Sequence, residues 1–289
     1  MTDARELRRL VEEATRLLGE AGVPSARHDA VALAAFALGV ERLDLVLPPP
    51  VPDGFARAFA GLVERRAGRE PLQHIVGSTG FRYLTLRVER GVFVPRPETE
   101  VVAGLAVDEA AARVAAGGNP LVVDLCTGTG AIAIAVATEV PGTRVVAVDL
   151  SPAAVDLATR NAHAARADVR LVLGDVRDPE VLDELAGDVD IVVANPPYIP
   201  PGAEPEPEVR RDPDLALAGG GPDGLDVPRA VLATATRLLR PGGLLVVEHA
   251  EVQAEALRAA AVAAGAFAEP RTVPDLTGRS RALVARRTP

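Results

Sequence analysis

The sequence predicts an α/β fold in which a mostly parallel sheet follows a smaller helical unit, and three observations lead to this prediction. From about residue 97 onward, short apolar runs alternate with longer amphipathic segments, as in a sheet that carries helices on both faces. The first 73 residues instead repeat apolar positions at helical spacing. Between the two, residues 74–96 alternate in the manner of a β-hairpin, with glycines near both ends.

The individual elements follow from the same periodicities. In the helical unit, helices are expected around Leu7–Leu18, over residues 31–38 and around Phe55–Leu62, with prolines at 48–52 separating the last two. In the sheet region, strands are expected at residues 121–123, 144–148, 169–173 and 189–194, with helices between them. Helices at 225–239 and 252–264 and strands at 244–247, 266–273 and 282–285 complete it. Residues 200–208, rich in proline and glutamate, are expected to form a mobile loop.

Composition excludes several classes of protein. A hydrophobic content of 48% is enough to build both cores, and a single cysteine excludes a disulfide framework within one chain. No apolar span is long and unbroken enough for a membrane helix, and residues 1–6 are acidic and amphipathic rather than signal-like. A cytoplasmic protein that binds no membrane is therefore expected. The net charge of −9 argues against sequence-independent binding to nucleic acid, which depends on a basic surface.

The turn that follows the apolar run Val189–Ala194 is the most informative motif. It consists of Asn195, Pro196, Pro197 and Tyr198. A residue before proline is driven into an extended conformation, which fixes the direction of the Asn195 side chain, and prolines have no N–H to compete for acceptors. The Asn195 oxygen and the Pro196 carbonyl can then accept both hydrogens of an amide or aromatic amine, while Tyr198 offers a flat face. The simpler interpretation is a proline turn that closes a strand.

A glycine loop precedes this turn in the chain. Residues 124–131 follow the apolar stretch 121–123 and open a helical segment, which is the context of a nucleotide-binding loop. The stretch Gly128–Ala133 also fits the looser dinucleotide fingerprint, so a dehydrogenase is a competing interpretation. A dehydrogenase would use the loop for a pyrophosphate. A methyltransferase would use it for the amino acid half of S-adenosylmethionine, and Asp124 suits a ligand with an ammonium group better than one with phosphates.

Two further strand ends carry acids. Asp149 ends the next predicted strand, where a carboxylate can accept hydrogen bonds from both hydroxyls of an adenosine ribose. Asp175 follows the third strand, where it can accept from an adenine amine or serve only as a turn former or helix cap. The turn at Asn195–Tyr198 completes the methyltransferase interpretation and has no role in a dehydrogenase.

Together these motifs resemble the class I S-adenosylmethionine-dependent methyltransferases that act on amide or amino nitrogens. Three more stretches narrow the resemblance: Glu70–Gly77, Val94–Glu100, and the run 215–225 with its two pairs Gly219-Gly220 and Asp223-Gly224. They are similar to the release factor glutamine methyltransferase family, and the likeness covers nearly the whole chain, most weakly at its start. The resemblance implies a Rossmann-like sheet with an antiparallel C-terminal strand, S-adenosyl-L-methionine as cofactor, and the Gly-Gly-Gln domain of bacterial peptide chain release factors as partner.

The resemblance also implies roles for particular residues. The cofactor would be bound by Asp124, Cys126, Thr127, Gly128, Thr129, Gly130, Asp149, Asp175, Val176 and Asn195. The substrate would be bound by Asn195, Pro196, Pro197 and Tyr198, with Asn195, Pro196 and Tyr198 as the catalytic group. No metal and no histidine is assigned a role. The expected domains are residues 1–73 for substrate recognition, 74–96 as a hairpin linker and 97–289 for catalysis, although the first unit can also be read as a purely structural bundle.

Some residues depart from the family pattern or allow two interpretations. Cys126 replaces the usual first glycine of the loop and is interpreted as a packed thiol rather than a redox group. Asp212 replaces the commoner Glu, and Val176 replaces an aromatic residue that could stack on adenine. In the stretch 94–100, Glu98 and Glu100 suit a helix N-terminus, and the resemblance suggests that the same stretch also borders the site.

Alternatives remain at this point. A nucleic acid adenine methyltransferase would use the same turn but should carry a basic face. A methyltransferase acting on a glutamine of a ribosomal protein would share every motif, and a non-catalytic adaptor that only docks on release factors is also conceivable. A monomer is expected.

Overall fold

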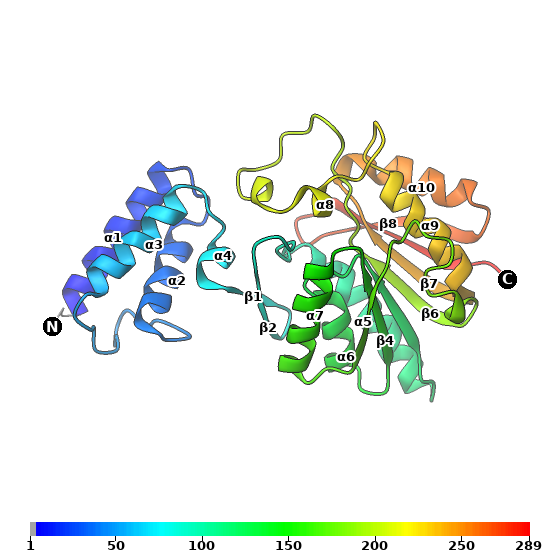
Figure 1. Cartoon of the computed structure of the whole chain (residues 1–289), viewed down its shortest axis with the longest axis horizontal. Helices are drawn as coiled ribbons and strands as arrows, with labels where there is room; N and C mark the ends of the chain where they lie inside the picture. The colour runs from blue at the N-terminus through cyan, green and yellow to red at the C-terminus, as the bar shows by residue number, and fades with distance from the viewer. Residues whose placement is uncertain (1–3) are drawn as a thin grey trace. The chain divides into compact units, whose positions relative to one another are not determined.

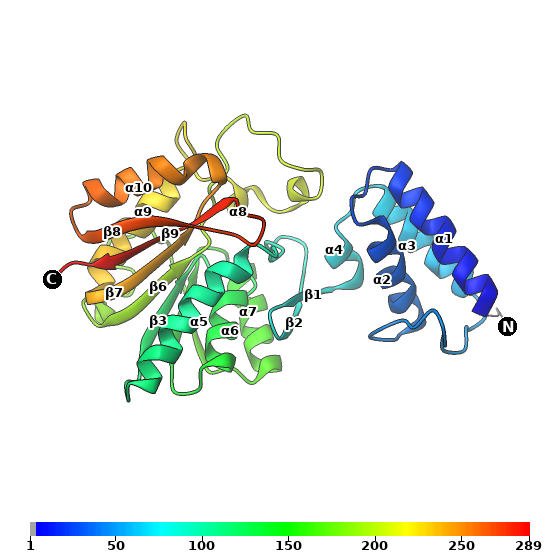
Figure 2. The same ribbon diagram turned by 180° about the vertical axis from the view of Figure 1, so that it is seen from behind.

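The computed structural model describes residues 4–289, so the first three residues of the acidic N-terminal segment lie outside the described chain. The chain forms two compact units. The first contains the residues up to Ser78 together with Pro205–Arg211, and the second contains Thr79–Glu204 and Asp212–Pro289. Figures 1 and 2 show the course of the chain from both sides. Within residues 4–289, no helix is long and apolar enough to cross a membrane.

The first unit is helical, as predicted. Its helices are α1 (Ala4–Glu20), α2 (Ala26–Leu38), α3 (Phe55–Ala67) and the short α4 (Leu72–Val76). The apolar spacing of α1 explains its packing, because Leu7, Val11, Ala14 and Leu18 fall on one face and are all buried. Helix α2 starts earlier than expected, after Ser25, and ends where Gly39 adopts the left-handed conformation. Stacked rings of Phe55 and Phe59, 5.4 Å apart, contribute to the same core.

A buried charge cluster holds residues 205–211 within the first unit. Arg66 is only 4% exposed and forms ion pairs with Asp29 at 2.7 Å and with Glu208 at 2.8 Å. Arg69 binds the other Glu208 oxygen at 2.6 Å and donates to the Gly22 carbonyl. Burial raises the pKa of Glu208, but the hydrogen bonds from Arg69 and Arg66 outweigh it and lower the pKa to about 2. Residues 200–208, expected to form a mobile loop, are thus anchored at Glu208.

A hairpin opens the second unit. It consists of β1 (Ser78–Phe81) and β2 (Leu84–Arg87), so it occupies only part of the stretch 74–96. Helix α4 takes up the start of that stretch, and an irregular segment runs from residue 88 to helix α5 (Thr99–Ala115). Phe81 and Leu86 are buried in the core of the second unit.

The main sheet has seven strands in the order β5-β4-β3-β6-β7-β9-β8. The first five in this order are parallel, and β9 pairs antiparallel with both β7 and β8. The strand bounds are β3 (Leu121–Leu125), β4 (Arg144–Asp149), β5 (Val169–Leu173), β6 (Val189–Ala194), β7 (Leu239–Glu248), β8 (Phe267–Pro274) and β9 (Ser280–Arg287). The α/β fold class, with its antiparallel C-terminal strands, is confirmed.

Helices cover both faces of the sheet (Figures 1 and 2). One core contains side chains from α5 and α6 (Ala131–Glu139), and helix α7 (Pro152–Ala165) adds Ala162 to it. The other core contains side chains from α9 (Asp226–Leu238) and α10 (Ala254–Ala263). Strands β3 and β6 are buried along their whole length, which explains why each is apolar except for one aspartate, Asp124 in β3 and Asp190 in β6. The short helix α8 (Asp214–Leu217) lies in the connection between β6 and α9.

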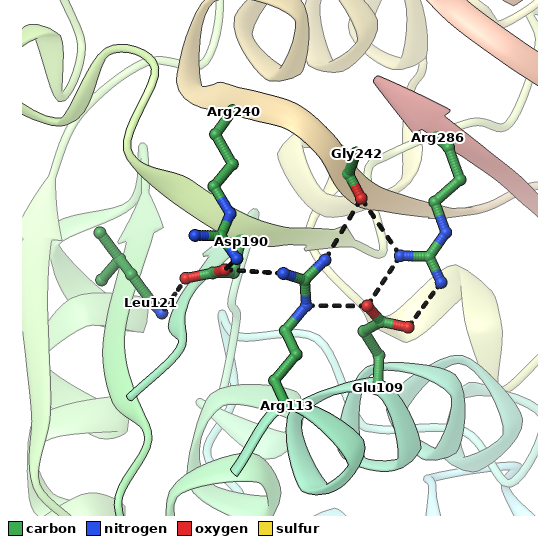
Figure 3. Close-up of polar contacts among 7 residues, drawn as sticks. All are labelled: Glu109, Arg113, Leu121, Asp190, Arg240, Gly242 and Arg286. Carbon is green, nitrogen blue, oxygen red and sulfur yellow. Dashed lines mark hydrogen bonds and ion pairs between the residues drawn. The ribbon is translucent and has the colours of Figure 1, made fainter. Parts of the chain in front are cut away.

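A network of ion pairs lies at the edge of the sheet where β3 and β6 begin (Figure 3). Asp190 is buried, accepts the backbone N–H of Leu121 at 2.8 Å, and forms ion pairs with Arg113 at 2.9 Å and with Arg240. Arg113 also binds Glu109, which in turn binds Arg286 at 2.6 Å. The network therefore ties α5, β3, β6, β7 and β9 together at the edge where the parallel strands begin.

Asp190 is expected to be a main source of stability at this edge. Replacing it by alanine leaves the buried N–H of Leu121 without its acceptor and removes the carboxylate shared by Arg113 and Arg240, so Asp190→Ala should lower the free energy of unfolding by about 3 kcal/mol. The matched control is Asp183→Ala, because Asp183 pairs with Arg237 but is 68% exposed, and its loss should cost less than about 1 kcal/mol. Urea unfolding measures both, and equal losses would contradict the assignment.

Candidate active site

The carboxyl ends of the parallel strands bring the candidate residues together. Leu125 at the end of β3 is paired with Ala194 at the end of β6. The next residue on each strand is therefore Cys126 on one side and Asn195 on the other, so the glycine loop and the proline turn start side by side. The neighbouring strands end in Asp149 on β4 and Glu248 on β7. Each of these strand ends carries an acid, an amide or a thiol at the same edge.

The glycine loop uses the left-handed conformation three times. Cys126 has φ +62°, Gly128 +56° and Gly130 +83°. A Cβ on Gly130 would lie 2.9 Å from Ile134 and 3.1 Å from Ala158, so only glycine fits there. A Cβ on Gly128 would meet nothing closer than 4.0 Å, which leaves its backbone open. The side chains of Thr127 and Thr129 are buried, so the loop would present mainly backbone to a ligand.

Cys126 occupies a position that favours glycine. Its side chain is half-buried and packs against the core between β3 and α9. Burial raises the pKa of this thiol, and the nearby carboxylates Asp149 and Asp124 raise it further. A thiolate is therefore disfavoured, which supports the interpretation of Cys126 as a packed wall of the loop rather than a redox group.

Asp124 is fully buried at the end of β3. Its Oδ2 accepts from the Thr127 hydroxyl at 2.6 Å and from the Ala133 N–H at 3.2 Å, whereas its Oδ1 has no partner among the described residues. Burial raises the pKa of Asp124 to about 7, opposed by these two hydrogen bonds. An unpartnered oxygen on a buried carboxyl group is an available acceptor for a cationic ligand.

Asp149 links the end of β4 to the glycine loop. Its two oxygens accept from the backbone N–H groups of Gly128 at 2.8 Å and Ser151 at 2.9 Å. Each carboxylate oxygen retains a second lone pair, which is what two ribose hydroxyls would need. Burial raises the pKa of Asp149, and the backbone hydrogen bonds oppose this rise.

The third strand end differs from the others. Asp175 forms an ion pair with Arg177 at 2.7 Å, and the hydrogen bond from Arg177 lowers the pKa of Asp175. Its carboxylate thus has a partner of its own within the chain. Val176 is buried in the core, and its carbonyl accepts from Thr234, so its side chain does not face an open site. Among the residues expected to bind the cofactor, these two have the weakest geometric support.

The proline turn keeps its acceptors available. Asn195 donates from Nδ2 to the Thr99 hydroxyl at 3.1 Å. Neither the Asn195 Oδ1 nor the Pro196 carbonyl accepts a hydrogen bond from any residue in the described chain. Tyr198 donates from its hydroxyl to Glu248, and burial raises the pKa of this hydroxyl above its usual value. The turn therefore presents two free acceptors to whatever binds beside the glycine loop.

The glycines that follow explain how this turn is held. A Cβ on Gly219 would lie 2.7 Å from the Cα of Tyr198, and one on Gly224 would collide with the Tyr198 carbonyl. The same carbonyl accepts from Gln253 Nε2 at 2.7 Å, and Gln253 also donates to the carbonyl of Asp223 at 2.8 Å. Close backbone approach, which only glycine permits, thus packs the segment 219–224 against the turn.

The segment before α5 borders both parts of the site. Thr99, the first residue of α5, contacts Asn195, and Phe93 in the preceding segment lies nearest to the open side of Gly128. Arg96 lies over the Phe93 ring at 5.2 Å and forms an ion pair with Asp212. Burial raises the pKa of Asp212 to about 6, although the charge of Arg96 opposes the rise. Asp212, noted in the sequence only as a departure from the family pattern, therefore fixes the segment around Val94.

Sequence reasoning missed several polar residues behind the site. Asn161 is buried on α7 and donates from Nδ2 to the Thr129 carbonyl at 3.0 Å, while its Oδ1 accepts from Arg87. It joins the glycine loop to the hairpin. A buried asparagine on the apolar side of an amphipathic helix was the available signal. Glu248 directly follows a predicted strand, as Asp149 does. Its position in the sequence therefore also marked it as a candidate, but the sequence analysis assigned it no role.

Comparison with known proteins identifies the class. Residues 108–207 match the family described as methyltransferase small domain. The structure resembles a methyltransferase from Pyrococcus furiosus, with a TM-score of 0.52 and 17% identity over 71% of this chain and 89% of that one. It also resembles a 16S rRNA methyltransferase from T. thermophilus in complex with AdoMet and guanosine, with a TM-score of 0.50 and 24% identity over 73% and 49% of the two chains. The fold is that of the class I methyltransferases.

The particular family follows from closer relatives. Residues 9–77 match the PrmC N-terminal domain. Release factor glutamine methyltransferases from Mycolicibacterium smegmatis and Streptomyces coelicolor are each 48% identical to this chain, over 97% and 96% of its length and 98% and 96% of theirs. One from Deinococcus radiodurans is 43% identical over 98% of this chain and 99% of its own length. The chain belongs to the release factor glutamine methyltransferase family.

The residues at the sheet edge fit the cofactor of this class, S-adenosylmethionine. The loop offers an open backbone at Gly128, and Asp124 offers a buried oxygen without a partner. Asp124, Asp149 and Glu248 make the edge acidic, and each has its pKa raised by burial, so a ligand that carries a sulfonium and an ammonium group would favour their ionised forms.

Asp149 is expected to contribute to cofactor affinity. Asp149→Ala should weaken S-adenosylmethionine binding by roughly 1.5 to 3 kcal/mol for each charged hydrogen bond removed. Calorimetry measures this, with Asp156→Ala as a control because Asp156 is 71% exposed on α7. Unchanged affinity in the Asp149 variant would remove it from the site.

Asp124 is expected to couple cofactor binding to pH. Because its pKa is raised to about 7, part of the protein holds a proton there at neutral pH, and an ammonium group beside it favours the ionised form. Affinity should therefore increase as the pH rises from about 6 to about 8, with proton release on binding at the lower pH. Calorimetry in two buffers of different ionisation enthalpy detects that proton. Asp124→Asn should abolish the dependence, and equal affinity of the unaltered protein at both pH values would contradict it.

Proposed function

We propose that this protein methylates the side-chain amide nitrogen of the glutamine in the Gly-Gly-Gln motif of peptide chain release factors, with S-adenosylmethionine as the methyl donor. The observation that carries the proposal is the pair of free acceptors, Asn195 Oδ1 and the Pro196 carbonyl, beside the glycine loop. A primary amide has two N–H bonds, which match two acceptors. Membership of the family supplies the choice of release factor as substrate.

The chain's own groups would act mainly by position. An amide nitrogen is a poor nucleophile because its lone pair is delocalised into the carbonyl, and bound cofactor supplies a methyl group on an electron-poor sulfonium. Asn195 and Pro196 would hold both N–H bonds and so direct the nitrogen toward the methyl group. Alignment at about 3 to 3.5 Å can contribute on the order of 7 to 11 kcal/mol to lowering the barrier. The same two acceptors would stabilise positive charge as it develops on nitrogen.

The turn needs no strong base for this step. The proton becomes acidic only after the nitrogen has been methylated, so it can leave to water. The raised pKa of Tyr198 keeps its hydroxyl protonated, and burial lowers the pKa of His249, whose Nδ1 lies 2.8 Å from the Ala250 carbonyl oxygen. Tyr198 would therefore serve as a wall for the amide plane rather than as a base.

The domain assignment is part of the proposal. Residues 1–73 would recognise the release factor, and residues 97–289 would bind the cofactor and carry out the methyl transfer. Residues 74–96 would be the linker between these two domains. The separate family match of residues 9–77 supports treating the helical unit as a module of its own.

The substrate assignment is tested by mass spectrometry. The protein is incubated with isotopically labelled S-adenosylmethionine and, separately, a release factor fragment containing Gly-Gly-Gln, a ribosomal protein with an accessible glutamine, and duplex DNA. A gain of one methyl group on the glutamine of the first substrate alone is expected. Preferential labelling of the ribosomal protein or of adenine would overturn the assignment.

Asn195 provides the test of the amide clamp. Asn195→Ala should lower turnover by at least about a hundredfold, the scale seen when one preorganised hydrogen-bonding group is removed, while cofactor binding falls much less. Asn195→Asp retains an acceptor but adds a negative charge beside the sulfonium, which stabilises the charged ground state. That variant should bind cofactor normally and still react slowly. Near-normal single-turnover rates in both variants would exclude the clamp.

A further inference from the structure

Three large apolar side chains are exposed near the carboxyl edge of the sheet. Leu276 is 96% exposed in the turn between β8 and β9, Val252 is 88% exposed just after β7, and Leu215 on helix α8 is 54% exposed. All three belong to the second unit, and together they are referred to as the apolar rim. Single exposed apolar residues are common on protein surfaces, so only their placement relative to the site gives them meaning.

Two members of the apolar rim lie on segments that are bonded to the proline turn. Gln253, the residue after Val252, donates from Nε2 to the Tyr198 carbonyl at 2.7 Å. Helix α8 is joined to the end of the turn, because the Ile199 N–H donates to the Leu217 carbonyl at 2.8 Å. These segments are therefore parts of the site's own framework, and their exposed side chains border it.

The third member, Leu276, lies beyond the edge of the sheet. The strand register places Ala282 of β9 beside Glu248, at the level of the first residue of the proline turn. Strand β9 begins at Ser280, two residues farther out, and the turn 275–279 lies beyond it. At about 3.3 Å per residue, Leu276 lies roughly 10 Å beyond that level, and two strand spacings of about 4.8 Å separate β9 from β6. Leu276 is therefore on the order of 15 Å from the proline turn.

The turn that carries Leu276 is held by many hydrogen bonds. The buried Asp275 side chain accepts from the Thr277 N–H at 2.9 Å, from the Thr277 hydroxyl at 2.6 Å and from the Arg279 N–H at 3.2 Å. The Asp275 N–H donates to the Arg279 carbonyl at 2.8 Å, and Arg281 pairs with the Asp275 carboxylate at 3.2 Å. A partner that covers Leu276 thus pays little for ordering its backbone, which favours its use in an interface.

The side of the proline turn on which these segments lie indicates the partner. The ends of β3 and β4, which carry the glycine loop and Asp149, lie on one side of β6, and β7 and β9 lie on the other. The cofactor would occupy the first side, so the second is left for the chain that carries the acceptor amide. Asn195 and Pro196 would hold only the side-chain amide of that chain. Its flanking residues then continue past the turn, where the apolar rim is the surface beside them.

We propose that the apolar rim, with Leu276 as its main contact, is the docking surface for the folded part of the release factor that presents the glutamine. The inference rests on the proposed function, since it concerns the substrate of the same site. About five extended residues span 15 Å, so the contact is made by residues of the release factor outside Gly-Gly-Gln. Such a remote contact is the same in the ground state and in the transition state, so it lowers KM without raising kcat.

The test compares Leu276→Ser, which removes the apolar contact, with Leu276→Met, which retains it. Because Leu276 is almost fully exposed, neither change should affect folding. Leu276→Ser should raise KM for an intact release factor by about tenfold, with kcat within about twofold and S-adenosylmethionine affinity unchanged. Leu276→Met should keep KM within about threefold, and Val252→Ser should raise it by about threefold or more. Val262→Ser is the matched control, because Val262 is 61% exposed at the far end of α10, and its KM should be unchanged.

Two further measurements separate docking from chemistry. A five-residue peptide, Gly-Gly-Gln with one residue added at each end, is too short to reach Leu276, so its kcat/KM should be equal for Leu276→Ser and the unaltered protein. An intact release factor with alanine in place of the reacting glutamine binds without turnover, and calorimetry should show about a tenfold weaker Kd for Leu276→Ser.

Unchanged KM and Kd for the intact release factor, or an equal loss with the short peptide, would overturn the proposal. So would a dimer of the unaltered protein that sedimentation shows to be lost in Leu276→Ser, because the apolar rim would then bind a second copy of this chain. An unaltered protein that does not methylate the intact release factor would instead refute the proposed function.

Discussion

The reversal of strand order between β3 and β6 is the constraint on which the site depends. From β3 the sheet grows outward through β4 and β5, and from β6 it grows the other way through β7. The connections that leave β3 and β6 therefore turn to opposite faces, and in open α/β sheets the ligand-binding crevice lies at the carboxyl ends between two such strands. The pairing of Leu125 with Ala194 sets the register, so the loop that begins at Cys126 and the turn that begins at Asn195 flank this crevice at the same level. A shift of one residue in this register would turn Asn195 to the other face.

The electrostatics of the crevice follow from this geometry. Strand ends that bring Asp124, Asp149 and Glu248 to one edge also bury them, and burial raises all three pKa values. A carboxyl group whose pKa is raised in the folded state contributes stability below its unfolded pKa, and that contribution is lost as the pH rises through the folded value. For Asp124 and Glu248 the loss falls between about pH 4 and pH 7. The folded protein is therefore less stable at neutral pH because these buried carboxyl groups ionise there. Binding of a cationic ligand would offset that loss of stability.

Local sequence signals predicted most of the fold and the strand-end residues. Predominantly apolar runs located β3 and β6. Residues directly after the predicted strands, such as Asp149 and Asn195, could be assigned to one edge because parallel strands share it. Contacts across large sequence separations were not predictable. Nothing in the sequence around Asn195 indicates that Thr99 is its partner, and the roles of Asn161 and Asp212 arise only when α7 and the segment before α5 pack on the loop. The short helix α4 was not predicted, because five residues are too few to show a helical repeat of apolar positions.

Residues 200–208 show what an argument from average composition leaves out. Proline and glutamate enrichment is typical of chain that cannot bury enough apolar surface to become ordered. That argument treats every glutamate as solvated, whereas Glu208 meets Arg66, a guanidinium that is almost fully buried and already paired with Asp29. With Arg69 as a fourth member, the cluster alternates in sign, so each buried charge has an opposite neighbour. Asp29 pairs with Arg66 within the helices, and Glu208 adds a second carboxylate to the same guanidinium group. One residue of the right charge therefore anchors the end of this segment at Glu208, and the mobility of residues 200–207 stays a prediction.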